Sequence, residues 1–281
     1  MKTDFSEAEL SAASMIIQDL LDGRENHGIE RLRALKEEIH AAIPEKLRIG
    51  RGITWVVERI SLLLATQSHS DEKFRNLALS LYAQLKGDDL LIGVSIFLMA
   101  EFGMRHPVET FGFFETAAQS GHWVVREFAA GAFRRIVGPN KDVVLPWLQK
   151  MARTSDPNQR RFASETLRPV TFNKWINQQP EYSLSVLRLL FKENHPYPRT
   201  SVGNNLSDLS RRQPELIFGV VKDLEATGDK NSYWIAYRAC RNLVKKEPQR
   251  VMNLLRVEEY HYKDRNFYKK ESLVLESQEY N

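Results

Sequence analysis

Two stretches of the sequence set the architecture: LSRRQPELIF at residues 209–218 and LVKKEPQRVM at residues 243–252. They superimpose with a displacement of 34 positions, which places Pro214 over Pro248 and a pair of basic residues over another pair. Proline is favoured at the first position of a helix, so each stretch predicts the end of one helix and the start of the next.

An earlier pair of segments has the same spacing. VVREFAAGAF (124–133) and QRRFASETLR (159–168) place Arg126 34 positions before Arg160. A helix pair of this length can bury its apolar face only against neighbouring pairs, so the pairs stack. We therefore predict an all-α protein, an α-solenoid or α-α superhelix, in which one helix of each pair lines a concave groove.

Apolar residues recur at helical spacing along nearly the whole chain, whereas strand-like alternation is scarce. Ser70-Asp71 and Asp156-Pro157 carry further helix-start signals. We expect helices at residues 5–21, 27–41, 54–66, 72–86, 90–102, 108–119, 122–137, 141–153, 158–167, 180–192, 199–212, 214–226, 231–246 and 248–255.

The composition is that of an ordinary folded protein, with 42% hydrophobic and 27% charged residues. The longest apolar run, residues 90–100, is half of the ~20 residues that a membrane span needs, so it predicts a buried helix. The N-terminus lacks the pattern of a secretory signal. A single cysteine, Cys240, excludes an internal disulfide and a cysteine metal cluster and is expected to be a small buried residue. We expect no metal, no cofactor and no membrane partner.

The charge is unevenly distributed along the chain. Residues 1–121 carry 13 basic and 18 acidic side chains, whereas residues 122–270 carry 27 basic and 15 acidic ones. A basic surplus of this size, gathered on one face, suits a polyanionic partner, because each Lys or Arg at a phosphate releases a counterion. The alternative is that these charges form a solvated exterior. The first interpretation predicts that the groove is basic.

Three acidic residues recur near the repeat interval. Glu127 lies four positions after Trp123, Glu165 four after Arg161, and Asp208 four after Asn204; the next repeat has Arg238 and Asn242. Residues four apart share a helix face, and adjacent helices lie about 8–10 Å apart, so the three acids are expected to surround one small volume. The alternative is a set of ordinary ion pairs with neighbouring arginines. An acidic pocket within a basic groove suits a polyanion that carries a local positive charge.

Tryptophans extend this interpretation. Trp123, Trp147, Trp175 and Trp234 all fall in the basic half of the chain. A cation over an indole face gains about 0.5–2 kcal/mol, which would favour a cationic ligand beside Trp123 and Trp234, on or beside the groove helices. Most tryptophans at helical spacing are core residues instead, and we assign Trp147 and Trp175 to the core.

Four segments carry a family resemblance: HWVVREFAAGAFR, DPNQRRFASETLRP, RTSVGNNLSDLSRRQPEL and WIAYRACRNLVKKEP. They resemble the bacterial DNA alkylation repair glycosylases of the AlkC and AlkD type, and AlkC more closely, over residues 70–255. The resemblance implies a HEAT-like repeat fold that binds double-stranded DNA in its concave face. It also implies hydrolysis of the N-glycosidic bond of positively charged N3- or N7-alkylated purines, by a monomer in the bacterial cytoplasm that is nucleoid-associated when bound to DNA.

The resemblance also assigns roles. Glu127, Glu165 and Asp208 are the expected catalytic carboxylates, because the alkylated purine leaves as a neutral base and the remaining sugar is oxocarbenium-like. The expected substrate-binding residues, which hold backbone phosphates, the acids themselves or the base, are Trp123, Trp234, Arg161, Arg168, Asn204, Asn205 and Arg238. We expect one repeat domain over residues 1–260, with N-terminal helices over 1–70 and DNA-binding repeats over 71–260, followed by a tail at 261–281.

Two segments depart from the family pattern. Tyr237-Arg238 replaces an Arg-His pair, and VTFNKW follows LRP in place of a basic, Pro-rich continuation. The sequence has no phosphate-binding glycine loop, no His-Glu-x-x-His and no Gly-x-Ser-x-Gly motif. Two alternative functions stay open: a non-catalytic repeat protein that recognises branched or damaged DNA, and a scaffold that binds other proteins through an apolar groove.

Overall fold

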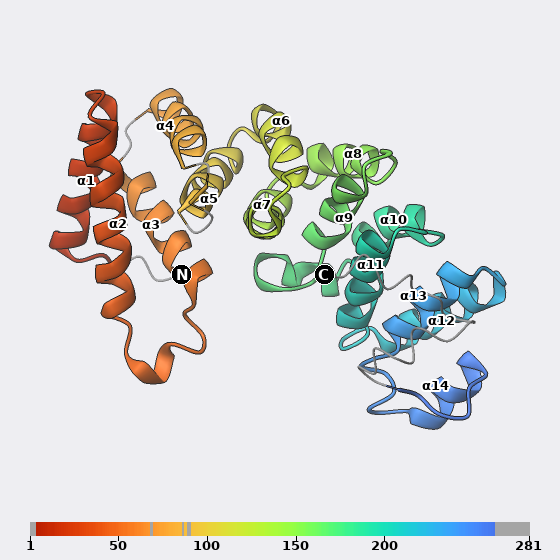
Figure 1. The fold of residues 1–281 in the computed structure, drawn as a ribbon. Coiled ribbons are helices and arrows are strands. Elements are labelled where there is room, and N and C mark those ends of the chain that lie inside the picture. Colours follow the sequence, from red (N-terminus) through yellow and green to blue (C-terminus); the bar gives the residue numbers. More distant parts are fainter. Residues whose placement is uncertain (1–3, 68–69, 86, 89–90, 262–281) are drawn as a thin grey trace. The chain divides into compact units, whose positions relative to one another are not determined.

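A computed structural model describes residues 4–67, 70–85, 87, 88 and 91–261. These residues form α-helices and short 3-10 helices, and none of them is in a strand (Figure 1). The all-α prediction is confirmed. None of the described helices is long and apolar enough to cross a membrane. The predicted tail lies outside the described residues except for residue 261.

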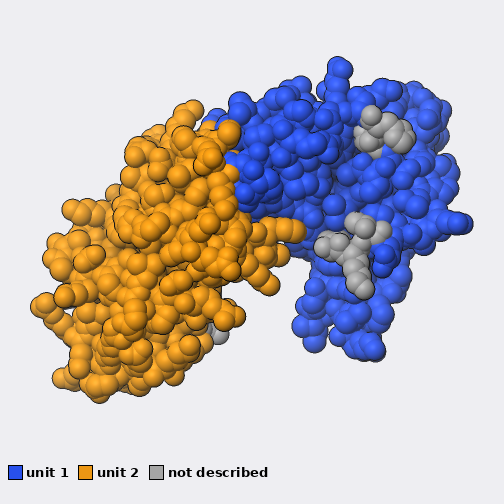
Figure 2. Space-filling view, turned by 180° about the vertical axis from the view of Figure 1, so that it is seen from behind, with its two compact units in different colours: residues 1–140 blue, residues 141–281 orange. Residues whose placement is uncertain are grey.

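The chain divides into two compact units, residues 1–140 and 141–281, coloured separately in Figure 2. The boundary falls inside the range expected to form one repeat domain, and that expectation stays a prediction. The first unit contains α1 (Glu7–Leu21), α2 (Glu25–Ala41), η1 (Glu45–Leu47), α3 (Ile53–Gln67), α4 (Asp71–Gln84), α5 (Ile92–Gly103), α6 (Pro107–Ala118) and α7 (Trp123–Val137).

In the first unit, α1, α3, α5 and α7 pack in succession, while α2, α4 and α6 pack against them from the other layer. Every residue of α5 is buried, as expected for the apolar run. A buried ion-pair cluster joins three of these helices, because Arg135 of α7 contacts Glu58 of α3 and Glu101 of α5. Successive helices of this layer are therefore joined by ion pairs as well as by apolar contacts.

The second unit continues the helical pairs. It contains α8 (Lys141–Met151), α9 (Pro157–Thr166), η2 (Thr171–Asn177), α10 (Pro180–Leu187), η3 (Arg188–Leu190), α11 (Pro196–Leu209), α12 (Pro214–Ala226), α13 (Lys230–Ala239) and α14 (Pro248–Leu255). Helix α11 packs between α9 and α13, and α12 packs against α13 and α14. Helices α9, α11 and α13 thus form one layer of this unit (Figure 1).

The 34-residue interval recurs at the starts of three helices. Helices α12 and α14 start with Pro214 and Pro248, and α10 starts with Pro180, 34 positions earlier still. The residue before each proline adopts nearly the same conformation, with φ between −128° and −132° and ψ between 56° and 62°. The proline that follows disfavours the helical conformation at this residue, so the chain enters α10, α12 and α14 in the same way.

The arginine repeat has a matching explanation. Arg126 donates from Nη1 to the carbonyl oxygens of Ser120 and Gly121, at 2.6 and 3.1 Å. Thirty-four positions later, Arg160 donates from Nη1 to the equivalent carbonyls of Thr154 and Ser155, at 3.0 and 2.8 Å. Each guanidinium therefore fixes the turn that enters its helix, which is a structural role.

Several helices differ from the predicted ranges. Helix α11 begins at Pro196 rather than near residue 199, because proline is tolerated in the first turn, where N–H groups have no intrahelical acceptor. Helix α13 ends at Ala239, so the second half of the predicted helix 231–246 is a series of turns. The 3-10 helix η2 occupies a segment for which no helix was expected.

Candidate functional site

Helices α9, α11 and α13 carry most of the predicted site residues of the second unit. Each begins with a side-chain cap: Asp156 accepts from the backbone N–H of Asn158, His195 from Tyr197, and Asp229 from Asn231 and Ser232. These caps satisfy backbone donors that have no acceptor inside the helix and fix where each helix starts.

Glu165 and Asp208, two of the three predicted catalytic acids, meet at one guanidinium. Arg168 donates from Nη1 to Glu165 at 2.9 Å, and from Nε and Nη2 to one oxygen of Asp208 at 2.8 and 2.6 Å. The side chains of Glu165 and Asp208 are 5% and 10% exposed. The expected proximity of these acids across repeats is therefore present, with Arg168 between them.

Glu165 has further donors. The Ser201 hydroxyl donates to its second oxygen at 2.5 Å, and Arg161 lies 3.8 Å from the same oxygen. The Arg161 guanidinium also stacks over the Tyr197 ring, 4.4 Å from its centroid. Two hydrogen bonds and a nearby guanidinium thus hold this buried carboxylate in place, and it is poorly placed to approach a ligand.

The electrostatics of this cluster favour the charged form of Arg168. Burial alone would lower the Arg168 pKa, but Glu165 and then Asp208 raise it well above its usual value. Arg211 lies 3.6 Å from the other oxygen of Asp208. The Glu165–Arg168–Asp208 cluster, defined by these three residues, is thus a fixed set of charges.

The asparagines of α11 hold neighbouring helices. Asn204 accepts from Nε of Arg238 at 2.9 Å and from Nη1 of Arg241 at 2.8 Å. Asn205 is fully buried and donates to the Ser164 carbonyl of α9 at 2.9 Å. Asn205 is therefore a packing residue in this structure. Arg238, which donates to Asn204, is partly exposed.

The two candidate tryptophans differ in exposure. Trp234 is 1% exposed and lies in the core of the second unit, with Arg199 and Arg238 over its ring at 5.0 and 5.3 Å. It offers no open ring face to a base, contrary to its predicted role, because its large apolar surface is more stable in the core. Trp123, by contrast, is 62% exposed at the first position of α7. Trp147 is buried, as expected.

Glu127, the first candidate for the catalytic carboxylate, belongs to the first unit. It lies on α7 one turn after Trp123 and is partly buried. Trp123 and Glu127 are thus on one face of a helix, as the spacing predicts. Cys240 is fully buried, and burial raises its thiol pKa to about 12, which excludes a reactive thiolate.

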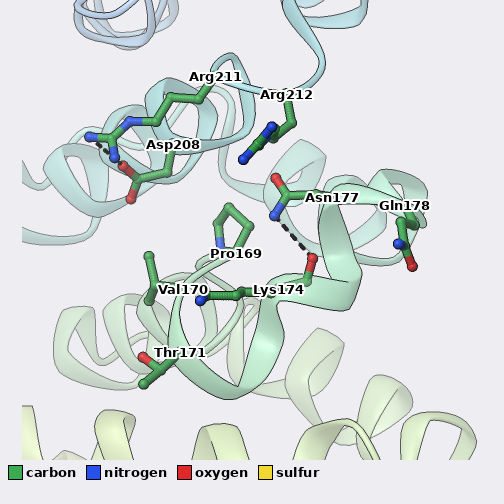
Figure 3. A pocket seen from close by; sticks show the side chains of 9 residues that line it. All are labelled: Pro169, Val170, Thr171, Lys174, Asn177, Gln178, Asp208, Arg211 and Arg212. Atoms are coloured by element: carbon green, nitrogen blue, oxygen red, sulfur yellow. Dashed lines mark hydrogen bonds and ion pairs between the residues drawn. The ribbon is translucent and has the colours of Figure 1, made fainter.

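A pocket of about 630 Å³ lies beside the cluster in the second unit (Figure 3). Asp208 forms part of its wall, together with three cationic residues, Lys174, Arg211 and Arg212. Lys174 belongs to VTFNKW, the segment that departs from the AlkC-like pattern. The two arginines belong to the segment that repeats after 34 residues. The sequence showed these cations, but only the fold brings residues 174 and 212 to one cavity.

Two solved structures resemble this chain over most of its length. The Pseudomonas fluorescens alkylpurine DNA glycosylase AlkC, bound to DNA containing an abasic site analog, matches 81% of this chain and 66% of its own, with 21% identity and a TM-score of 0.53. AlkD2 from Streptococcus mutans matches 75% of this chain and 96% of its own, with 20% identity and a TM-score of 0.55. The chain has the AlkC and AlkD2 fold. The helical-repeat solenoid that the AlkC/AlkD resemblance implied is confirmed.

Sequence comparison adds one relative. The uncharacterized protein YhaZ of Bacillus subtilis is 24% identical over 229 residues, which cover 80% of this chain and 55% of YhaZ. The chain therefore spans about half the length of this curated relative. No family model matches the chain. At these identities the AlkC and AlkD2 likeness establishes the fold.

Proposed function

We propose that the protein is a DNA glycosylase that hydrolyses the N-glycosidic bond of cationic N3- or N7-alkylated purines in double-stranded DNA. The observation that carries the proposal is that Glu165 and Asp208, 43 positions apart in the chain, meet at Arg168 beside a cationic pocket. The fold shared with AlkC, a glycosylase solved on DNA, supports it.

The chemistry needs a carboxylate near the sugar. An alkylated purine departs as a neutral base, so the leaving group requires little general acid catalysis, whereas the sugar develops positive charge. A fixed carboxylate stabilises that charge and orients or deprotonates water. Glu127 is the first candidate for this role, and Asp208 is the second, because Arg168 donates to only one Asp208 oxygen and Arg211 lies 3.6 Å from the other. Glu165 is assigned to hold Arg168, because its oxygens are already occupied by Arg168, Ser201 and Arg161.

The test is release of methylated purines from alkylated duplex DNA. We expect Glu127→Gln or Asp208→Asn to lower the release rate by about 10²–10³-fold, as loss of one fixed electrostatic group does. Glu181→Gln is the matched control, because Glu181 is an exposed carboxylate paired with Arg188. Undiminished release by both site variants would remove these acids from the mechanism.

A second function is favoured by a specific observation. Arg168 pairs with both Glu165 and Asp208, and its positive charge weakens their ability to stabilise a cation. A DNA-binding repeat protein without chemistry, which recognises branched or damaged DNA, would need no exposed carboxylate. Tight, steeply salt-dependent DNA binding with no base release from any lesion would establish this alternative and exclude the glycosylase.

A further inference from the structure

The pocket beside Asp208 is made by two segments that are distant in sequence. One wall is residues 169–178, which include η2; the other is Asp208 at the end of α11 with Arg211 and Arg212 in the turn before α12. Figure 3 shows Lys174 and Arg212 on opposite sides of the cavity, with Pro169 between them. Its volume, about 630 Å³, accommodates a sugar-phosphate group.

The charges of the pocket favour an anion. Among the described residues, no hydrogen bond or ion pair engages the side chain of Lys174 or of Arg212, and Arg211 is 64% exposed. Asp208, the only acid among the described lining residues, has one oxygen bonded to Arg168 and the other 3.6 Å from Arg211. Among the described residues, Lys174 and Arg212 therefore bring positive charges without an acidic partner to this cavity, while Asp208 is already paired with Arg168 and Arg211.

Hydrogen bonds fix the walls of this pocket. The Gln213 side chain donates to the Asn177 carbonyl at 2.7 Å and so fastens the two walls together. Asn173 is fully buried and donates to the Thr166 carbonyl at 2.7 Å, which anchors η2 to the end of α9. Thr171, two positions before Asn173, has a φ of 48°, a conformation that a β-branched residue rarely adopts. Such strain persists only where the surrounding contacts determine it, and it is common at ligand sites.

We propose that this pocket binds a phosphodiester of the DNA strand that carries the reacting sugar. The inference rests on the proposed function, because it takes DNA as the ligand. None of the described residues that line the cavity is aromatic, so the pocket provides no platform for stacking a base. A backbone phosphate needs only cations and polar donors, which are what the lining offers. A free nucleotide would lack its usual stacking partner.

Asp208 gives the pocket its place in the mechanism. The same carboxylate lines the cavity and belongs to the Glu165–Arg168–Asp208 cluster. A phosphodiester bound here would therefore lie next to the acids and fix the strand relative to them. Lys174 and Arg212 are positioning residues in this account, since they contact the backbone and not the reacting atoms.

The first experiment measures DNA affinity without any base release. The double variant Lys174→Gln/Arg212→Gln is compared with Lys222→Gln/Lys230→Gln, which removes the same charge from exposed residues outside the pocket. On an undamaged duplex, we expect the pocket variant to bind about tenfold more weakly and to lose about 1–2 from the slope of log K against log salt. Equal affinity and slope in the pocket variant and the wild type would overturn the inference.

The second experiment identifies the phosphate. Single phosphates flanking an abasic analogue are replaced by neutral methylphosphonate in a series of duplexes. One substitution is expected to weaken wild-type binding and to leave the pocket variant unaffected, since the two changes remove the same contact. Purely additive effects at every position would contradict the proposal, as would binding of adenosine monophosphate in the pocket with DNA affinity unchanged.

The outcomes separate this inference from the glycosylase proposal. If no base is released but the pocket variant binds DNA more weakly than the wild type, the phosphate site is supported and the glycosylase proposal is rejected. If base is released and the pocket variant binds DNA as tightly as the wild type, the glycosylase proposal is supported and the phosphate site is rejected. Absence of DNA binding by the wild type would overturn both.

Discussion

Arg168 and Asp208 lie 40 positions apart and share two hydrogen bonds, from Nε and Nη2 of the guanidinium to a single carboxylate oxygen, at 2.8 and 2.6 Å. The contact joins the end of α9 to the end of α11, and Glu165 extends it by a third bond to the same guanidinium. Because all three groups are largely buried, the pair fixes the relative position of two repeats as well as the charge of the site.

Loss of Arg168 should therefore destabilise the second unit. Arg168→Met leaves Glu165 and Asp208 without their common partner, and removal of one member of a buried ion pair costs about 3–5 kcal/mol. Arg168 is 29% exposed, so we expect a loss at the lower end, about 3 kcal/mol, in urea unfolding at pH 7. Arg188→Met, at an exposed pair with Glu181, should cost about 0–1 kcal/mol. Equal losses in the two variants would show that the cluster contributes no more than a surface pair.

Close approach of α11 and α13 predicts a second pair of outcomes. A Cβ at Gly203 would lie 2.8 Å from Cβ of Arg238, an atom too near the backbone to move aside. Gly203→Ala should therefore lower the melting temperature and loosen the Asn204–Arg238 bond.

Gly219 provides the control for this change. It lies within α12 and has nothing within 4 Å of the site of a Cβ, so Gly219→Ala should raise stability by about 0.5–1 kcal/mol. Thermal unfolding of both variants tests the pair. A neutral or stabilising Gly203→Ala would mean that the two helices do not approach as described.

Much of the fold follows from local signals in the sequence. Apolar periodicity and first-position prolines placed the helices, and the 34-residue interval is matched by the same backbone conformation before Pro180, Pro214 and Pro248. The start of α11 was missed because Pro196 and Pro198 together resemble a break, although both fit a first turn. The helix η2 was missed because its anchors, Asn173 and Gln213, act through tertiary hydrogen bonds.

The site was predictable only in part, since pairing across helices is not encoded by spacing along one helix. The interval of four residues correctly placed Arg161 with Glu165, but the main partner of Glu165 is Arg168, which also reaches Asp208. Trp234 was expected to face a ligand and is buried instead. The sequence around a tryptophan beside arginines does not show whether the ring is buried or exposed.

The buried cluster of the first unit predicts a pH dependence. Burial raises the pKa of Glu58 above its ordinary value of 4.5, and Arg135 lowers it by less. A carboxyl whose pKa is raised in the folded state contributes most stability below pH 4.5 and loses that contribution as the pH rises through the folded pKa. Glu58→Gln keeps the side chain neutral. Its melting temperature relative to the wild type should therefore increase between pH 4 and pH 7.

Glu181→Gln gives the opposite trend and serves as the control. A hydrogen bond from Arg188 lowers the Glu181 pKa, so the wild-type carboxylate contributes stability above its unfolded pKa and loses it as the pH falls. The difference between Glu181→Gln and the wild type should become slightly more negative as the pH rises. A flat difference for Glu58→Gln over this range would contradict the inferred pKa shift.

The exposure of Trp123 separates a binding role from a packing role. Trp123 is 62% exposed at the start of α7, whereas Trp147 is 7% exposed and packs edge-on against Phe162, 5.8 Å between centroids. Trp147→Ala should cost about 3–5 kcal/mol of stability, as loss of a core aromatic does. Trp123→Ala should leave the free energy of unfolding within about 0.5 kcal/mol of wild type, as at other exposed positions.

DNA affinity then tests the role of the exposed ring. Stacking of a base on an aromatic side chain is worth about 1–3 kcal/mol, so Trp123→Ala should weaken binding to a duplex with an abasic analogue by about 5- to 150-fold. Trp123→Phe retains an aromatic face and should recover most of the affinity. Unchanged affinity in Trp123→Ala would remove this residue from the DNA surface, and failure of Trp123→Phe to recover would indicate that the indole N–H, rather than the ring face, makes the contact.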